Sequence, residues 1–226
     1  LSGGSLPSGG RVRVLDHEPF KRRAELLRQI TLVMGNKQQL LWDLPAMDSL
    51  RVNAAVYAIP EDEAEQRIKR FAGMLNVEKE LTQPVRKLSL GQRMKCELIA
   101  ALLHHPKVLF LDEPTLGLDV NAQTAVRDFL KQYNEENGAS ILLTSHYMAD
   151  ITALCERVVV IDKGTILYDG TLEGVVQRFA PLREVRLDLA APVDDATLAP
   201  FGEIESNEGN QARLLVQRDV LTETVT

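Results

Sequence analysis

The chain has 226 residues, of which 45% are hydrophobic and 26% are charged, a balance typical of a globular protein rather than a disordered one. With 26 basic and 32 acidic residues its formal net charge is −6, which argues against nucleic-acid binding because such proteins usually carry a basic excess. No apolar run approaches the roughly 20 residues of a membrane-spanning helix, and the first ten residues lack the basic start and apolar core of a signal peptide.

The first 75 residues predict two strands and three helices. The alternating stretch 11–15, after a loop rich in glycine and serine, predicts a half-buried strand, and the apolar run 30–34 predicts a second one. A basic amphipathic stretch at 20–28 predicts a helix. Two further helices are expected at 46–58 and 61–75, the second because a proline and three acidic residues stand at its start.

The next hundred residues alternate between helices and continuous apolar runs. Helices are expected at 91–105, 121–137 and 148–154, and strands at 108–111, 141–144 and 158–161. This alternation predicts a parallel sheet that is covered by helices on both faces. A turn at 162–164 leads into the run 165–168, so the last of these strands is also expected to form a hairpin.

The pattern changes again beyond about residue 181. The stretch 184–189 alternates between polar and apolar residues as a half-buried strand does, and 213–216 is a candidate partner strand. We expect 181–226 to be a small appended domain, complete or cut short.

Two isolated cysteines and four histidines give no sign of a structural metal. Cys96 and Cys155 form neither a CxxC pair nor a disulfide framework, so we expect buried, reduced thiols of a cytosolic protein. The histidines show no HxxxH or HExxH spacing.

The apolar run that begins at Val108 ends in two acidic residues, Asp112 and Glu113. A strand that ends in acids at the rim of a parallel sheet places both carboxylates where ligands bind. In phosphoryl-transfer ATPases an Asp at such a strand end helps to hold Mg²⁺, and the next Glu can polarise the attacking water. A buried strand that merely ends in an acidic turn is the alternative.

About twenty residues earlier, Leu88–Gln92 stands directly before a predicted helix. Ser89 suits the N-cap position, and Gly91 allows the backbone to approach a ligand closely. The free N–H groups of a helix N-terminus bind anions such as the γ-phosphate. A bare helix cap would explain Ser89 equally well.

These stretches resemble the nucleotide-binding domain of ABC transporters. Leu88–Gln92 looks like the signature motif LSGGQ, with Leu90 where Gly is commonest, and Val108–Glu113 looks like the Walker B strand with its catalytic glutamate. Leu116–Asp119 resembles the D-loop, and His146 the switch histidine that contacts the γ-phosphate. The resemblance implies Glu113 and His146 as catalytic residues, Asp112 as a Mg²⁺ ligand, and an ATP contact set of Ser89, Leu90, Gly91, Gln92 and Asp119.

The stretch from Ile30 to Pro45, which ends in an expected loop at 36–45, resembles the Q-loop region of the same family. By position the family's Gln is replaced by Asn36, and Gln39 stands just downstream, so either residue is a candidate for that role. The phrase from Gly35 to Pro45 looks most like exporters of the ABC-2 group. Trp42 is open to two interpretations, core packing or a contact with the membrane subunit.

A phosphate loop of the form GxxxxGK[ST] does not occur in the sequence. This loop supplies the backbone N–H cradle and the Lys that hold the β- and γ-phosphates. In the family it lies upstream of the stretch that begins here at Leu1. The chain is therefore expected to be truncated before or at this loop, and to be inactive by itself.

The resemblance implies an α/β fold with a P-loop NTPase-like ABC ATPase core at 1–180, a helical subdomain at about 46–105, and a small C-terminal α+β appendage at 181–226. It further implies ATP and Mg²⁺ as ligands, a second nucleotide-binding domain in a homodimer or heterodimer, and an ABC-2-type membrane permease as partner. The protein is then expected to lie on the cytoplasmic face of the cell membrane, with no nucleic acid bound.

Two alternatives remain at this stage. One is a soluble ABC ATPase that acts on ribosomes or DNA, although the tandem cassettes, basic insertion or coiled coil usual in such proteins are not visible. The other is a non-catalytic regulatory fragment. The transported substrate is not predictable from the sequence.

Overall fold

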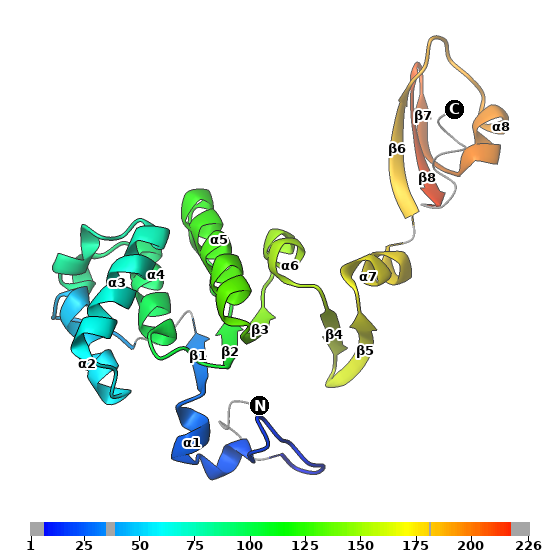
Figure 1. Cartoon of the computed structure of the whole chain (residues 1–226). Helices are drawn as coiled ribbons and strands as arrows, with labels where there is room; N and C mark the ends of the chain where they lie inside the picture. The colour runs from blue at the N-terminus through cyan, green and yellow to red at the C-terminus, as the bar shows by residue number, and fades with distance from the viewer. Residues whose placement is uncertain (1–6, 35–38, 181, 218–226) are drawn as a thin grey trace. The chain divides into compact units, whose positions relative to one another are not determined.

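The computed structural model of the protein (Figure 1) describes residues 7–34, 39–180 and 182–217. The chain forms two compact units, Leu1–Leu154 and Cys155–Thr226. None of the helices in the described ranges combines the length and the hydropathy that crossing a bilayer takes.

A three-stranded parallel sheet organises the first unit (Figure 1). Its strands, in the order in which they pair, are β1 (Ile30–Met34), β2 (Val108–Asp112) and β3 (Ser140–Thr144). Met34 pairs with Asp112, and Asp112 with Thr144, so the carboxyl ends of all three strands lie at one edge. The predicted strands 30–34, 108–111 and 141–144 are confirmed.

Helices α2 (Ala46–Val56), α3 (Glu61–Leu75) and α4 (Leu90–Leu102) form a helical layer between β1 and β2 in sequence. The short 3₁₀ helices η2 (Glu80–Thr82) and η3 (Val85–Lys87) connect α3 to α4. Three acidic residues in the first turn of α3 favour its positive end, and Asn76 in the left-handed conformation ends it. The helices expected in this part of the chain are confirmed within a few residues at their ends.

One hydrophobic core joins the helices to one face of the sheet. Val33, Leu109 and Leu111 point into it from the strands, and α4 and α5 (Val120–Asn137) supply the opposing side chains. Phe71 of α3 meets Phe129 of α5 edge to face, with ring centroids 5.5 Å apart. Burying an aromatic ring of this size contributes about 1.5–3 kcal/mol, so this contact fixes α3 against α5.

The other face of the sheet is covered only in part by the described residues. Phe110 packs there with Leu26 of the four-residue helix α1 (Ala24–Leu27). Its register partners Leu32 and Leu142 remain 40% and 49% exposed. Among the described residues of the first unit, the helix that packs on this face is the short α1.

The strand predicted at 11–15 is wrong. Val14 and His17 form an isolated bridge around a turn, in which Leu15 and Asp16 have positive φ angles of 47° and 61°. The helix predicted at 20–28 is divided into η1 (Pro19–Lys21) and α1, because Arg22 between them adopts the left-handed conformation.

The second unit begins with a hairpin of β4 (Val158–Asp162) and β5 (Thr165–Gly170), followed by α7 (Leu172–Phe179). The hairpin prediction is confirmed, because β4 pairs antiparallel with β5.

The remainder of the second unit is a small antiparallel sheet with its own core. Its strands are β6 (Leu182–Asp188), β7 (Glu203–Glu208) and β8 (Gln211–Gln217), in the order β6-β8-β7, with α8 (Asp195–Leu198) and η4 (Ala199–Phe201) before β7. Leu198, Leu214 and Val216 are buried in this core. The pairing of the predicted strands 184–189 and 213–216 is confirmed, and β7 was not predicted.

Candidate functional site

The carboxyl edge of the parallel sheet carries the first group of predicted site residues. Asp112 is the last residue of β2 and is exposed, and the hydroxyl of Thr144 on β3 donates a hydrogen bond of 2.7 Å to its Oδ1. This bond follows from the register, since the two residues are direct partners across the ladder. The carboxylate of Asp112 is thus oriented by its neighbour and remains accessible from the strand end.

Glu113 turns sharply away from the strand. Its φ angle is 51°, a region that non-glycine residues adopt rarely and that clusters at functional sites. Its backbone N–H donates to the carbonyl of Thr144 at 3.1 Å, which fixes the turn against β3. This conformation directs the Glu113 side chain toward the segment that follows β3.

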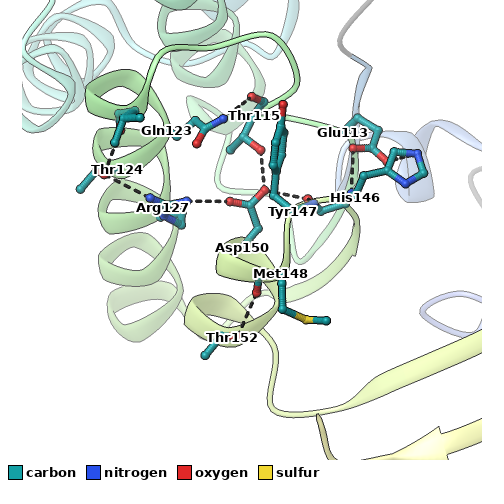
Figure 2. A network of polar contacts seen from close by, with 12 residues as sticks. Glu113, Thr115, Gln123, Thr124, Arg127, His146, Tyr147, Met148, Asp150 and Thr152 are labelled. Carbon is teal, nitrogen blue, oxygen red and sulfur yellow. Dashed lines mark hydrogen bonds and ion pairs between the residues drawn. The ribbon is translucent and has the colours of Figure 1, made fainter. Parts of the chain in front are cut away.

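Glu113 and His146 are in direct contact (Figure 2). The backbone N–H of His146 donates to Oε2 of Glu113 at 3.2 Å, and Nε2 of His146 lies 3.3 Å from Oε1. The Glu113 side chain is 18% exposed and the His146 side chain is 84% exposed. In this arrangement the partly buried carboxylate can accept a proton from a reacting group, and the accessible imidazole can donate a hydrogen bond to the same group.

The residues at the start of α4 form a second group. Ser89 and Gln92 make a reciprocal capping box: the N–H of Gln92 donates to the Ser89 hydroxyl at 3.2 Å, and the N–H of Ser89 donates to Oε1 of Gln92 at 2.9 Å. Gln92 also donates to the carboxylate of Glu80 at 3.1 Å. Both side chains are therefore engaged within the chain. The N–H groups at the start of a helix in general favour anions.

The start of α5 packs against the start of α4. Asp119 caps α5 by accepting from the N–H of Ala122 at 2.9 Å. A Cβ at Gly91 would lie 3.1 Å from that of Ala122, and one at Gly117 would lie 3.2 Å from Cδ2 of Leu90. Leu90, where the signature motif most often has Gly, thus fills the space beside Gly117.

The loop after β1 is anchored to α4 by a carboxylate that the sequence analysis missed. The backbone N–H groups of Gln39 and Leu40 both donate hydrogen bonds to the carboxylate of Glu97. The bond from Gln39 to Oε2 of Glu97 is 2.9 Å long. Burial raises the pKa of Glu97, and the bonds from Gln39 and Leu40 oppose that shift. The signal was a single acidic residue within an otherwise apolar helix stretch. The Gln39 amide donates to the carbonyl of Leu32 at 3.4 Å, and Asn36 lies outside the described residues.

A buried network was missed as well (Figure 2). The carboxylate of Asp150 accepts from Thr115, from Ser145 and from the guanidinium of Arg127. Asp150 and Thr115 are both 0% exposed. Only the folded chain brings these four residues together, so no sequence pattern signalled them.

The predicted site residues therefore fall into two groups. Asp112, Glu113 and His146 gather at the ends of β2 and β3 and are called the strand-end group. The signature group lies at the starts of α4 and α5 and comprises Ser89, Leu90, Gly91, Gln92 and Asp119. Across the described part of the chain, no hydrogen bond joins the side chains of one group to those of the other.

Asp112 fits the requirements of a Mg²⁺ ligand. One of its oxygens is oriented by Thr144, and the side chain is accessible. Mg²⁺ is usually held by one or two carboxylates together with substrate phosphates and water, rather than by an all-protein cage. In the described ranges no cluster of three or more His, Cys, Asp or Glu residues exists that would form such a cage.

Two family models match parts of the chain. Residues 10–148 match a family model described as an AAA domain (AbiEii toxin, type IV TA system), and residues 181–226 match the C-terminal domain of EvrA-like ABC transporters. The ABC transporter ATP-binding protein NatA of Bacillus subtilis is 30% identical over 171 residues, which are 76% of this chain and 69% of NatA. The chain belongs to the ABC transporter ATP-binding protein family.

Further ABC proteins are similar over most of the chain. The bacitracin transport ATP-binding protein BcrA of Bacillus licheniformis is 28% identical over 80% of this chain and 58% of its own length. The solved structure of an ATP-binding subunit of an ABC transporter has a TM-score of 0.69 at 25% identity, covering 79% of this chain and 73% of that one. The structure of cbiO1 from Clostridium perfringens, part of the cbiONQ transporter complex, has a TM-score of 0.67 at 25% identity, covering 80% and 76%.

Proposed function

We propose that this protein is the ATP-hydrolysing subunit of an ABC exporter, in which hydrolysis drives transport through an ABC-2-type membrane permease. The observation that carries the proposal is the contact between Glu113 and His146 beside Asp112, at the carboxyl edge of the parallel sheet. Ligands bind at this edge in open α/β sheets, and the similar proteins are named as ATP-binding subunits of ABC transporters.

Each residue of the strand-end group has its own role. Asp112 holds Mg²⁺ directly or through water, and bound Mg²⁺ supplies positive charge to the phosphate oxygens. Glu113 accepts a proton from the attacking water. His146, whose ring is largely exposed, donates a hydrogen bond to the γ-phosphate while its backbone N–H keeps Glu113 oriented.

The signature group acts on the ATP of a second nucleotide-binding domain. Ser89, Leu90, Gly91, Gln92 and Asp119 lie at two adjacent helix starts. Helix starts favour anions, which supports a role for this group in binding phosphates. In this proposal each domain of a head-to-tail homodimer or heterodimer completes the site of the other.

The loop after β1 faces the membrane subunit in this proposal. Gln39 or Asn36 senses the nucleotide, and three apolar side chains that follow, Leu41, Trp42 and Leu44, are 41–45% exposed. The guanidinium of Arg93 on α4 lies 5.6 Å from the centroid of the Trp42 ring, so the exposed apolar segment contacts α4. The protein then binds the cytoplasmic face of the cell membrane through its permease.

The proposal is tested by replacing Glu113 in the intact protein. Glu113→Gln keeps the shape of the side chain and removes the base, so steady-state ATP hydrolysis should fall by about a hundredfold or more while ATP binding is retained. The matched control is Glu135→Gln, an exposed glutamate on α5, which should hydrolyse ATP at the wild-type rate. Hydrolysis by Glu113→Gln at the wild-type rate would exclude the role given to Glu113.

A further inference from the structure

Asp150 is a fully buried carboxylate on the short helix α6 (Met148–Leu154). Acidic side chains are almost never fully buried unless they are paired, because removing a charge from water is costly. Such a residue needs an explanation in terms of its partners.

The partners of Asp150 come from three separate segments (Figure 2). Its Oδ2 accepts from the hydroxyls of Thr115 and Ser145, the latter at 2.7 Å, and its Oδ1 accepts from Nη1 of Arg127 at 3.1 Å. Thr115 follows β2, Ser145 follows β3, and Arg127 lies within the 18-residue helix α5. One carboxylate therefore ties two strand-end loops to a long helix.

Both of these loops carry a candidate catalytic residue. Thr115 stands two residues after Glu113, and Ser145 directly precedes His146. Ser145 is fixed further, since its Oγ accepts from the N–H of Tyr147 at 3.0 Å. Asp150 is therefore hydrogen-bonded both to the loop that carries Glu113 and to the loop that carries His146.

The side-chain contact between Glu113 and His146 contributes only a small part of the free energy that holds this geometry. The His146 side chain is 84% exposed, and exposed ion pairs contribute little because water screens them. The Asp150 contacts are buried, where hydrogen bonds to a charged group are stronger. A displacement of about 1 Å between reacting groups can lower a rate a hundredfold.

We propose that Asp150 is a positioning residue for ATP hydrolysis, which holds the Glu113 loop and the His146 loop in register against α5 through Thr115, Ser145 and Arg127. The inference rests on the proposed function, because it assigns to Asp150 the alignment of the two residues that act there. The side chain does not touch the nucleotide.

Removing Asp150 outright leaves Arg127 as an unpaired, mostly buried charge and can unfold the protein. The test therefore uses the hydroxyl partners in matched pairs. Thr115→Val has nearly the shape of threonine but cannot donate to Asp150, whereas Thr115→Ser retains the hydroxyl. Ser145→Ala and Ser145→Thr form the second pair.

The kinetic constants of ATP hydrolysis are measured for all four variants in the intact protein. We expect Thr115→Val and Ser145→Ala to lower kcat by between about tenfold and a hundredfold with an unchanged KM for ATP. Thr115→Ser and Ser145→Thr should restore most of kcat. Combining Thr115→Val with Glu113→Gln should add no further loss, because residues that act as a unit are not additive.

Two results would overturn the inference. If Thr115→Val and Ser145→Ala lower only the melting temperature and the folded protein keeps the wild-type kcat, the network is structural alone, while the proposed function stands if Glu113→Gln is inactive. If Glu113→Gln itself hydrolyses ATP at the wild-type rate, the proposed function fails, and the positioning role fails with it.

Discussion

The backbone nitrogen of Gln39 lies 2.9 Å from Oε2 of Glu97, so a buried carboxylate on α4 holds the segment that follows β1. Glu97→Leu leaves the N–H groups of Gln39 and Leu40 without an acceptor and should destabilise the protein by about 1–3 kcal/mol. Glu97→Gln retains one oxygen and should cost less. Urea unfolding of both variants measures the difference, and equal stability of all three proteins would contradict this anchoring role.

Glu97 also makes a specific contribution to the pH dependence of stability. Burial raises its pKa above the ordinary value of 4.5, so between that pH and the raised pKa the folded state binds more protons than the unfolded state. The free energy of unfolding should therefore fall as the pH rises through this range. Glu97→Gln lacks this contribution, and its stability relative to the wild type should improve with increasing pH. A constant difference across the range would show that Glu97 does not titrate in this way.

His104 should produce the opposite pH dependence. Its ring stacks on Tyr57 with centroids 3.8 Å apart, and burial lowers the pKa of His104 from 6.5 to about 4. Between these values the unfolded chain binds a proton that the folded chain does not, so the free energy of unfolding falls as the pH falls. His104→Phe keeps an aromatic ring and removes the titration. From about pH 7 to about pH 4 the free energy of unfolding of the wild type should therefore fall relative to that of His104→Phe, and a difference that stays constant with pH would contradict the assignment.

The close approach of Gly117 to Leu90 predicts a conformational requirement in the turn that precedes α5. Gly117 has a φ angle of 74°, and a Cβ there would lie 3.2 Å from Cδ2 of Leu90. Gly117→Ala should cost about 1 kcal/mol or more, since alanine is strained at positive φ. Gly9→Ala is the control, because a Cβ at Gly9 would meet no atom within 4 Å. Equal melting temperatures for both variants would rule out this requirement.

The signature group predicts a defect in dimer closure. Ser89→Arg places a long side chain at the start of α4, where the proposal puts the phosphates of the partner's ATP. It should abolish ATP-dependent dimerisation of the Glu113→Gln protein in light-scattering measurements. Ser89→Ala removes only the cap, at about 1 kcal/mol, and should still dimerise. Dimerisation of Ser89→Arg on ATP would mean that the signature motif is misplaced.

The strands of the parallel sheet were predictable because their signal is local. Runs such as Val108–Leu111 are apolar throughout, as the buried part of a central strand must be. The alternation at 11–15 was equally local but misleading: Arg11, Arg13 and Leu15 are exposed, and among the described residues Val14 bridges only to His17 across a turn. Strand β7 was missed because its residues Glu203–Glu208 are mostly polar and are held by pairing with β8.

The candidate site divides in the same way. The motif residues Asp112, Glu113 and His146 were predictable from their order along the chain. The roles of Glu97 and Asp150 were not, since a buried acid becomes visible only when the groups that satisfy it are known. Gln39 lies 58 residues from Glu97 along the chain, and Thr115 lies 35 residues from Asp150. Both separations are too long for a local sequence pattern to reveal the contact.

The most direct test of the account is the fate of bound ATP in a single turnover. The intact protein and its Glu113→Gln variant are mixed with a limiting amount of Mg-ATP, and the bound nucleotide is analysed over time, which separates chemistry from product release. The account predicts that the wild type converts ATP to ADP, whereas the variant retains bound ATP unhydrolysed. Conversion to ADP at equal rates in both proteins would contradict the central claim that Glu113, oriented by His146, is the base for ATP hydrolysis.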